Sequence, residues 1–372
     1  MSLQEPIRSL LFSTLYPSSV RPGHGIFVET RLRELLASGK VQTKVVAPVP
    51  WFFSKHPRFG SYAHFAQTPE MESHNDIDVR HPRYFLPPKI GMTAAPFALA
   101  LGAIPAIRGL LAQGFDFDLI DAHYYYPDGV AAAMLARHFR RPFTVTARGS
   151  DVNLIATHAV PRKLMLWAAD KAAASMGVSK ALVDNLVRLG ADRAKLEVMR
   201  NGVDLQRFQM LDQLQARESL GWPQQPTLIS VGNMVHNKGH HIAIEALREL
   251  AEFRLVIVGD GPEHTVLANL CRQWGLEARV AFAGRVLQQD LARYYSAADI
   301  LVLPSSREGW PNVLLESMAC GTPVVASDVG GVSEIVTSAD AGRLLTALTS
   351  PALVASVRDL WRQYPSRASV RR

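Results

Sequence analysis

The sequence predicts an α/β protein made of two Rossmann-like, doubly wound parallel sheets that face a central cleft. Its 372 residues are too many for one ordinary hydrophobic core and suit two domains. Short runs rich in Val, Ile and Leu alternate with segments of helical period, which is typical of strand–helix–strand units. The pattern occurs twice, so we expect one domain over residues 1–200, a hinge at about residues 200–210, and a second domain over residues 201–372.

In the first half, strands are expected at residues 8–15, 44–49, 118–123, 142–147, 174–178 and 195–199. Between the first two, Val28, Leu32, Leu35 and Leu36 lie at positions i, i+4, i+7 and i+8, a spacing typical of one helix face. Gly39 is expected to end this helix, because glycine readily adopts the left-handed conformation of the residue that follows a helix.

In the second half, strands are expected at residues 227–231, 254–258, 279–283, 299–304 and 323–326, with helices such as 242–250 and 313–319 between them. Pro223 and Pro226 mark where this sheet begins after a polar, Gln-rich stretch. Two open parallel sheets in tandem predict a ligand site between the domains, at the carboxyl ends of the strands, where helix N-termini attract phosphate.

Residues 50–89 fit neither the helical nor the strand period and hold six prolines and several aromatic residues. They are expected to form an insertion on the first domain. Such a segment either lines a functional cleft or is a surface excursion without a role, and the sequence favours neither alternative.

Residues 90–107 form the longest apolar stretch without charge, but two prolines weaken it as a membrane span. The first interpretation is an amphipathic helix whose Phe97, Leu101 and Ile104 face the core. The second is a helix that docks on a membrane beside the neighbouring basic residues.

Composition and charge restrict the function classes. The 40 Lys and Arg against 33 Asp and Glu give a net charge of +7, which suits an anionic ligand, nucleic acid or an anionic membrane surface. No block of basic residues and no nucleic-acid-reading motif is present, so nucleic acid ranks lowest. Cys271 and Cys320 fit neither a disulfide framework nor a zinc site. With an N-terminus unlike a signal peptide, we expect a cytoplasmic protein.

The most informative segment is LPSSREGWPNVLLESMACGTPVVASD, residues 303–328. A strand is expected to end before a loop that carries Glu308, and Glu316 follows about one turn into the next helix, so both carboxylates are expected to point at one crevice. Asn312 is a suitable N-cap. The N–H groups of Val313 and Leu314 would then be free to meet a phosphate.

This segment, EGWPNVLLESMACGTPVVASDVGG, resembles the signature of retaining glycosyltransferases of family 4, the glycosyl transferases group 1. The resemblance implies the two-domain GT-B fold and a hexosyltransferase. Its donor would be a UDP- or GDP-sugar, and its acceptor a hydroxyl of a glycan or lipid-linked molecule in exopolysaccharide or envelope glycan synthesis.

Two parts of the first domain resemble family motifs at the donor site. In GHGIFVE, Gly23, His24 and Gly25 resemble the glycine-rich loop whose backbone approaches the donor pyrophosphate; an ordinary turn is the plainer interpretation. His123, the last residue of DLIDAH, resembles the family histidine that reaches the transferred sugar, although a lone histidine at a strand end is more often structural.

A third motif, TVTARGSD, resembles the family's next strand end at the cleft. The resemblance implies that Arg148 supports the phosphates and that Asp151 contacts the acceptor or the donor. Each could equally be half of a structural ion pair.

In the second domain, Lys238 in NKGHH resembles the family lysine that opposes the diphosphate leaving group. Asn233 stands where the family usually has an arginine, which puts full neutralisation of the diphosphate in doubt unless Arg148 or Arg285 substitutes. Gly261, in VGDGPEH, would lie beside the nucleotide base.

The resemblance therefore implies three catalytic residues, His123, Glu308 and Lys238, and an acceptor-side residue, Asp151. No metal is expected, because cations and N–H dipoles would stabilise the leaving diphosphate and no Asp-x-Asp motif is present. The expected donor-binding residues are Gly23, His24, Gly25, Arg148, Asn233, Lys238, Gly261, Arg285, Glu308, Gly309, Trp310, Asn312, Val313 and Glu316.

Two other functions stay open: a nucleotide-sugar epimerase on the same fold, for which no acid/base pair is found, and a non-catalytic nucleotide-sugar-binding partner subunit, which Asn233 encourages. A lipid-linked acceptor and the basic charge suggest peripheral association with the anionic inner face of the cell membrane. The chain ends in PSRASVRR, which resembles the start of the family's closing helical segment, so the final crossing helix is expected to be missing. Oligomeric state is not predicted.

Overall fold

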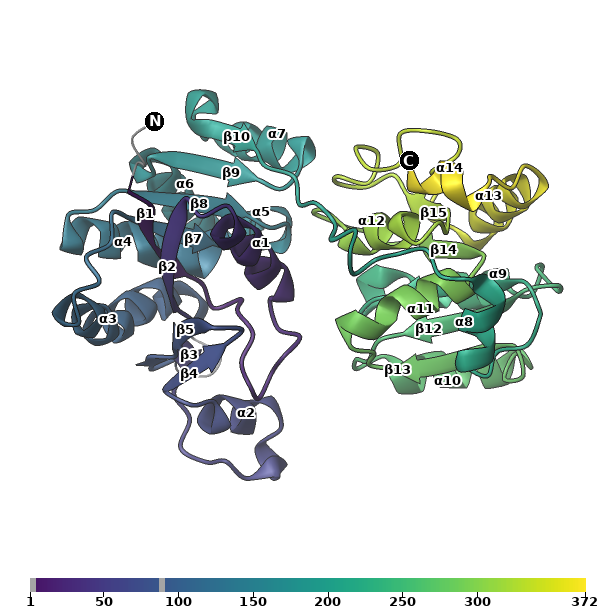
Figure 1. The fold of residues 1–372 in the computed structure, drawn as a ribbon, viewed down its shortest axis with the longest axis horizontal. Helices are drawn as coiled ribbons and strands as arrows, with labels where there is room; N and C mark the ends of the chain where they lie inside the picture. Colours follow the sequence, from purple (N-terminus) through teal and green to yellow (C-terminus); the bar gives the residue numbers. More distant parts are fainter. Residues whose placement is uncertain (1–4, 87–90) are drawn as a thin grey trace. The chain divides into compact units, whose positions relative to one another are not determined.

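A computed structural model describes residues 5–86 and 91–372. The chain divides into two compact units, Met1–Met199 and Arg200–Arg372, drawn in purple to teal and in teal to yellow in Figure 1. Each unit holds one large, mostly parallel sheet with helices between successive strands. The predicted fold class, two doubly wound α/β sheets, is confirmed.

The sheet of the first unit has eight strands in the order β10-β9-β8-β7-β1-β2-β5-β4. All neighbours pair in parallel except β4 and β5. The strands are β1 (Ile7–Phe12), β2 (Val41–Val46), β4 (Met71–His74), β5 (Ile77–Arg80), β7 (Leu119–His123), β8 (Phe143–Ala147), β9 (Ala174–Gly177) and β10 (Leu196–Val198), with a separate parallel pair of β3 (Val49–Pro50) and β6 (Arg83–Tyr84).

Helices of the first unit connect these strands. The expected first helix is present as α1 (Ile26–Ala37), which buries Val28 and Leu32 against β1, β2 and β5. Gly39 has a φ of 68° and follows its end, as predicted. The others are α2 (Ser61–Gln67), α3 (Gly91–Ala112), α4 (Val130–Phe139), α5 (Ser150–Asn153), α6 (Ala159–Lys171) and α7 (Lys180–Leu189).

The segment expected to be an insertion is in part an extension of the sheet. Strand β5 pairs in parallel with β2, and its Ile77 and Val79 are buried in the same core as α1. The sequence did not reveal β5 because it is four residues long and lies among prolines. Residues 87–89 of the expected insertion lie outside the described residues.

Helix α3 presents the opposite face to the one predicted. Phe97 and Leu101 are 48% and 70% exposed and Ile104 is half-buried, so the expectation that these three face the core is wrong. A Cβ on Gly102 would lie 2.6 Å from the Arg83 carbonyl oxygen, so small residues are needed where the helix meets β6. The buried side chains of α3 include Ala95, Leu99, Ala100, Ala103, Ile107 and Leu110.

By length and composition, α3 is the one helix among the described residues that is long and apolar enough to cross a membrane. Of the most apolar 18-residue stretch of α3, 39% is buried within the protein. The buried side also packs on α4. The helix is thus part of the fold of the first unit and leaves one apolar side uncovered by the described residues.

The sheet of the second unit has six parallel strands in the order β13-β12-β11-β14-β15-β16. The predicted strands at residues 227–231 and 254–258 match the observed bounds, and the last strand of the sheet was not predicted. The strands are β11 (Thr227–Val231), β12 (Arg254–Val258), β13 (Val280–Gly284), β14 (Ile300–Leu303), β15 (Val324–Ser327) and β16 (Gly342–Leu345).

Two separate cores cover the faces of this sheet. Along β11, Leu228 packs in one core and Ile229 in the other, because successive strand residues point to opposite faces. Helices α9, α10 and α13 contribute to the first core, and α11, α12 and α14 to the second. The helices are α8 (Gln213–Ser219), α9 (His240–Ala246), α10 (His264–Gln273), α11 (Leu291–Ala297), α12 (Asn312–Ala319), α13 (Ser350–Arg362) and α14 (Arg367–Arg371).

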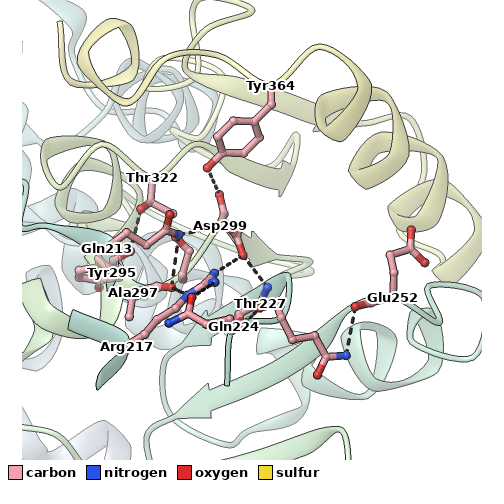
Figure 2. A network of polar contacts seen from close by, with 12 residues as sticks. Gln213, Arg217, Gln224, Thr227, Glu252, Tyr295, Ala297, Asp299, Thr322 and Tyr364 are labelled. Carbon is pink, nitrogen blue, oxygen red and sulfur yellow. Dashed lines mark hydrogen bonds and ion pairs between the residues drawn. The ribbon is translucent and has the colours of Figure 1, made fainter. Parts of the chain in front are cut away.

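A buried polar network around Asp299 ties elements of the second unit together (Figure 2). One carboxylate oxygen of Asp299 accepts hydrogen bonds from Arg217 Nη2 at 2.7 Å and from the Thr227 N–H at 2.6 Å, and the other accepts from Gln213 Nε2 at 3.0 Å. The Asp299 backbone carbonyl accepts from the Tyr364 hydroxyl at 2.7 Å. Helix α8 and the starts of β11 and β14 therefore meet at one carboxylate, and the segment after α13 is held by the backbone of the same residue.

We predict that Asp299→Ala lowers the free energy of unfolding by about 3–5 kcal/mol, since it leaves the buried Arg217 guanidinium without its carboxylate. Urea denaturation of the full chain measures this. The matched control is Asp290→Ala, which removes an ion pair to Arg293 whose partners are 40% and 44% exposed. The control is expected to stay within about 0.5 kcal/mol of the wild type. Equal effects of the two substitutions would contradict the structural role of the network.

Candidate functional site

The second unit brings two predicted site residues into direct contact. Lys238 Nζ donates to Glu308 Oε1 at 2.7 Å, with the two side chains 23% and 9% exposed. Lys238 follows β11 and Glu308 follows β14, and these strands are neighbours at the centre of the sheet. The carboxyl ends of adjacent parallel strands therefore place a cation and a carboxylate together, as expected for an open α/β sheet.

Close backbone packing fixes the two loops that carry this ion pair. Gly239 has a φ of 69°, and a Cβ there would lie 1.9 Å from the Pro304 carbonyl oxygen, so only glycine fits. The Ser306 N–H donates to the Asn237 carbonyl at 2.9 Å. The backbone thus places Lys238 at one position relative to the loop after β14.

The loop from Gly309 to Asn312 is anchored to the first residues of the second unit. Trp310 Nε1 donates to the Asn201 carbonyl at 3.0 Å, and the Arg200 guanidinium lies 5.9 Å from the centre of the Trp310 ring. Gly309 accepts a hydrogen bond from the N–H of Gly331. Trp310 is therefore held from the side of residues 200–201.

The prediction that Asn312 caps α12 is wrong. Pro311 occupies the cap position and Asn312 is the first helical residue, with its side-chain oxygen accepting from Asn201 Nδ2 at 3.3 Å. The Leu314 N–H, expected to be free, donates to the Pro311 carbonyl at 3.1 Å. The extended residue that the cap position requires is supplied by proline, whose fixed φ suits it. Val313 is partly buried in the first turn.

Glu316 is buried one turn into α12, as predicted. The Tyr295 hydroxyl of α11 donates to Glu316 Oε2 at 2.8 Å. Gln288 also hydrogen-bonds Glu316 and accepts from Arg207 Nη1 at 2.7 Å. Burial raises the pKa of Glu316 to about 7, against the opposing effect of these neighbours. The carboxyl group of Glu316 therefore changes its charge near neutral pH, and a group that binds it would shift this change.

A buried histidine supports the loop between β11 and Lys238. Ser230 Oγ lies 2.9 Å from His240 Nδ1, and His240 Nε2 lies 3.3 Å from the Asn233 carbonyl oxygen. Burial lowers the pKa of His240 to about 4, so the ring is neutral. The Asn233 side chain is exposed, which leaves its backbone carbonyl as the structural contact of this residue.

The loops after β12 and β13 place two further predicted residues. Gly261 lies against the backbone of Met234 in the loop after β11. Arg285 follows the edge strand β13, is 62% exposed, and pairs with Asp260 at 3.2 Å. Gly261 and Arg285 follow the carboxyl ends of their strands, as Lys238 does. The positive charge of Arg285 is exposed to solvent.

A group of metal-ligand side chains flanks Lys238, and sequence reasoning did not single it out. His236, His241 and Glu263 offer ligand atoms that all lie within 4.8 Å of one another. The two imidazoles stack with ring centres 4.7 Å apart. The side chain of His236 is 81% exposed, so this group is an open surface cluster.

In the first unit, the predicted glycine-rich loop is held by its own chain. Gly25 precedes α1 with a φ of 68°, and a Cβ there would lie 2.3 Å from the backbone of Leu15. His24 Nε2 lies 3.0 Å from the Thr14 carbonyl, and burial together with Arg21 lowers its pKa. A Cβ on Gly23 would meet no described atom within 4 Å. The need for Gly25 thus arises from packing on the segment after β1.

His123 ends β7 and is 1% exposed. Arg148 Nη2 lies 2.6 Å from His123 Nδ1, and Asp121 Oδ2 lies 3.3 Å from His123 Nε2. Burial lowers the pKa of His123 to about 4. The negative charge of Asp121 opposes this shift, and the positive charge of Arg148 adds to it. The neutral ring then accepts from Arg148 and donates to Asp121. Because both nitrogens are engaged, this geometry does not support the expected contact with the transferred sugar.

Asp151 is a buried anchor of the backbone, and its role at the acceptor stays a prediction. Its carboxylate accepts from the N–H groups of Tyr125 and Gly149, both at 2.8 Å, and of Arg148 at 3.1 Å. Burial raises its pKa above the usual range. The same interactions fix the loop after β8, where the Arg148 guanidinium stacks 5.2 Å from the centre of the Phe27 ring.

Asp128 is a second buried carboxylate of this unit that sequence reasoning missed. Its Oδ2 accepts from the Thr14 N–H and the Thr14 hydroxyl, both at 2.9 Å. Its Oδ1 is buried without a hydrogen-bond partner, and burial raises its pKa to about 7. Hydrophobic spacing carries no signal for such a residue, because its partners come from a loop more than a hundred positions earlier in the chain.

We predict that Asp128 makes stability fall as the pH rises from about 4 to about 7. Its pKa is raised in the folded state, so the native protein holds a proton that the unfolded chain has lost, and each pH unit of this window costs about 1.4 kcal/mol. Asp128→Asn resembles the protonated acid in shape and is expected to flatten this part of the profile. Thermal denaturation across the window measures the slope for both proteins, and an unchanged slope in Asp128→Asn would refute the assignment.

Two family models together match nearly the whole chain. One is described as Glycosyltransferase Family 4 and matches residues 23–207, and the other is described as Glycosyl transferases group 1 and matches residues 212–372. The boundary between these two matches lies close to the boundary between the two units.

Two curated relatives are informative. The chain is 32% identical over 337 residues to TuaC of Bacillus subtilis, which is named as a teichuronic acid biosynthesis glycosyltransferase, with 88% of this chain and 83% of the relative covered. It is 26% identical over 255 residues to the N-acetyl-alpha-D-glucosaminyl L-malate synthase of Bacillus anthracis, with 67% and 66% covered.

Solved structures extend the likeness at the level of the fold. Sucrose-phosphate synthase from Thermosynechococcus elongatus matches with a TM-score of 0.78 at 20% identity, covering 98% of this chain and 91% of that one. HepE of Anabaena, in complex with UDP-glucose, matches with a TM-score of 0.73 at 19% identity, covering 98% and 92%. Together with the sequence matches, these findings show that the chain belongs to the family 4, group 1 glycosyltransferases and is a transferase enzyme of the GT-B fold.

Proposed function

We propose that the chain is a retaining glycosyltransferase that moves a hexosyl group from a UDP- or GDP-sugar to a hydroxyl of a glycan or lipid-linked acceptor. The observation that carries this proposal is the Lys238–Glu308 ion pair at the carboxyl ends of β11 and β14. It combines a cation suited to a diphosphate with a carboxylate suited to sugar hydroxyls.

The reaction requires stabilisation of the charge that grows on the departing diphosphate. Lys238 would supply one positive charge there. The exposed Arg285, after β13, would supply a second, because Asn233 stands at the position where the family usually has an arginine. Because these groups and the backbone N–H dipoles can carry the charge, we propose that the donor is bound without a metal ion.

Glu316 would accept hydrogen bonds from the ribose hydroxyls of the donor, and Glu308 would orient the transferred sugar. As the bond between the anomeric carbon and the diphosphate breaks, the acceptor oxygen would form the new bond on the same face. The proton of the acceptor hydroxyl would pass to the departing phosphate oxygen, which is the nearest base on that face.

The name of the Bacillus subtilis relative, a teichuronic acid biosynthesis glycosyltransferase, supports an acceptor in polysaccharide or envelope glycan synthesis. The complex of HepE with UDP-glucose supports a nucleotide-sugar donor. Cys271 and Cys320 are both buried free thiols, which supports a reducing, cytoplasmic location.

Acceptor-dependent release of free nucleoside diphosphate tests the reaction. We expect release from one of the UDP- or GDP-sugars only when a polyprenyl-linked or glycan acceptor is added, with the donor's anomeric configuration retained in the product by NMR. Lys238→Met is expected to lower turnover by roughly 100- to 1,000-fold, the effect of removing one group that stabilises transition-state charge. Conversion of the donor to its epimer, or normal turnover in Lys238→Met, would overturn the proposal.

Nucleotide affinity tests the role of Glu316 separately. An ionised carboxylate accepts hydroxyl hydrogen bonds better than a neutral one, so wild-type affinity for the nucleoside diphosphate is expected to rise as the pH passes through about 7. Glu316→Gln is expected to bind roughly 10- to 100-fold more weakly at high pH and to lose this pH dependence. Calorimetric titration measures both, with the exposed Glu218→Gln as the control. Wild-type affinity in Glu316→Gln would sink the assignment.

A further inference from the structure

The first unit exposes a cluster of aromatic side chains that the proposed reaction does not use. Phe52 lies within 4.6–5.3 Å, centre to centre, of the rings of Phe53, Phe59 and Tyr62. Aromatic side chains are usually buried in the core, because each has a large apolar area. A cluster of exposed rings therefore indicates a surface that contacts a partner or a membrane. We call this cluster the aromatic patch; its members are Trp51, Phe52, Phe53, Phe59, Tyr62, Phe65 and Phe85.

The outermost members of the patch are far from buried. Phe53 is 68% exposed, Phe85 is 66% exposed, and Trp51, whose ring lies 6.4 Å from that of Phe85, is 50% exposed. They come from two separate segments of the chain, before α2 and after β6. The patch is therefore a surface assembled by the fold.

Most charged residues beside the patch are basic, and the acid at its border is Glu70, which lies close enough to Arg83 to interact with its charge. No Asp or Glu occurs in residues 51–69, where Lys55 and Arg58 are exposed. The Arg58 guanidinium lies 4.8 Å from the centre of the Phe59 ring, and Arg21 lies 5.0 Å from the centre of the Phe65 ring. Apolar rings interleaved with cations complement a surface that is apolar inside and anionic outside.

Helix α3 continues this surface. The Leu86 side chain, which follows Phe85, packs against Gly91 at the first residue of the helix. From there Met92, Phe97 and Leu101 are 45%, 48% and 70% exposed. No acidic residue occurs from residue 79 to residue 115. The exposed side of α3 therefore adds apolar area to the surface of the first unit without adding negative charge.

We propose that the aromatic patch and the exposed side of α3 dock the enzyme on an anionic lipid bilayer. Trp, Tyr and Phe suit the boundary between headgroups and acyl chains, and Lys and Arg near an anionic surface add electrostatic attraction. Because the other side of α3 is buried in its own domain, the helix lies on the bilayer and does not cross it. The biological use of this surface rests on the proposed function, in which the acceptor is lipid-linked.

Sedimentation of the full chain with vesicles tests the proposal. We expect binding to vesicles of phosphatidylglycerol mixed with phosphatidylcholine and little binding to phosphatidylcholine alone. Phe53→Ser with Phe85→Ser, and separately Lys55→Glu with Arg58→Glu, are each expected to weaken binding by roughly tenfold or more. The charge control, Lys171→Glu with Lys180→Glu, changes residues that are 59% and 66% exposed elsewhere on the same unit and is expected to bind like the wild type.

Nucleoside diphosphate binding by the same variants separates this proposal from the proposed function, since the docking variants are expected to keep wild-type nucleotide affinity. Several results would overturn the docking proposal: no vesicle binding by the wild type, equal binding to both kinds of vesicle, or wild-type binding by both docking variants. A dimer in size-exclusion chromatography that is lost in the Phe53→Ser, Phe85→Ser variant would assign the patch to a second copy of the chain and would also overturn it.

Discussion

The contact between Lys238 and Glu308 is the interaction on which the account of the site depends. A carboxylate that is 9% exposed is costly to bury without a partner, and Lys238 supplies that partner at 2.7 Å. The lysine can occupy this position only because Gly239 lets its loop touch the backbone of Pro304. A diphosphate would compete with Glu308 for the ammonium group and leave the carboxylate available to sugar hydroxyls. The ion pair therefore keeps both groups ordered before the donor binds.

The same principle, a buried carboxylate that organises loops, recurs in the first unit and at the opposite end of the second sheet. Asp151 holds the loop that carries Arg148, and Asp128 ties the segment after β1 to the loop after β7. Asp299 joins the starts of β11 and β14, the two strands whose other ends carry Lys238 and Glu308. The strands that carry Lys238 and Glu308 are thus held at their other ends by a polar anchor, Asp299.

The sequence predicted the features that depend on local periodicity and on the order of strands. Two strands of the second sheet were placed at their observed bounds, and Lys238 and Glu308 were each placed after a strand. Their contact was not predicted, because it depends on β11 and β14 being neighbours in the sheet. Features set by distant partners were not accessible: the role of Asp151 arises from backbone groups such as that of Tyr125. On α3, two sets of residues share helical spacing. The larger side chains appeared to be the core face, but the close approach to β6 requires the smaller ones.

A crystal structure of the full chain with its nucleotide sugar tests the central claim most directly. We expect Lys238 Nζ to leave Glu308 and contact a phosphate oxygen of the donor, Glu308 to turn to the hydroxyls of the transferred sugar, and Glu316 to accept from the ribose. A donor bound elsewhere, with the Lys238–Glu308 pair intact at its present 2.7 Å, would contradict it.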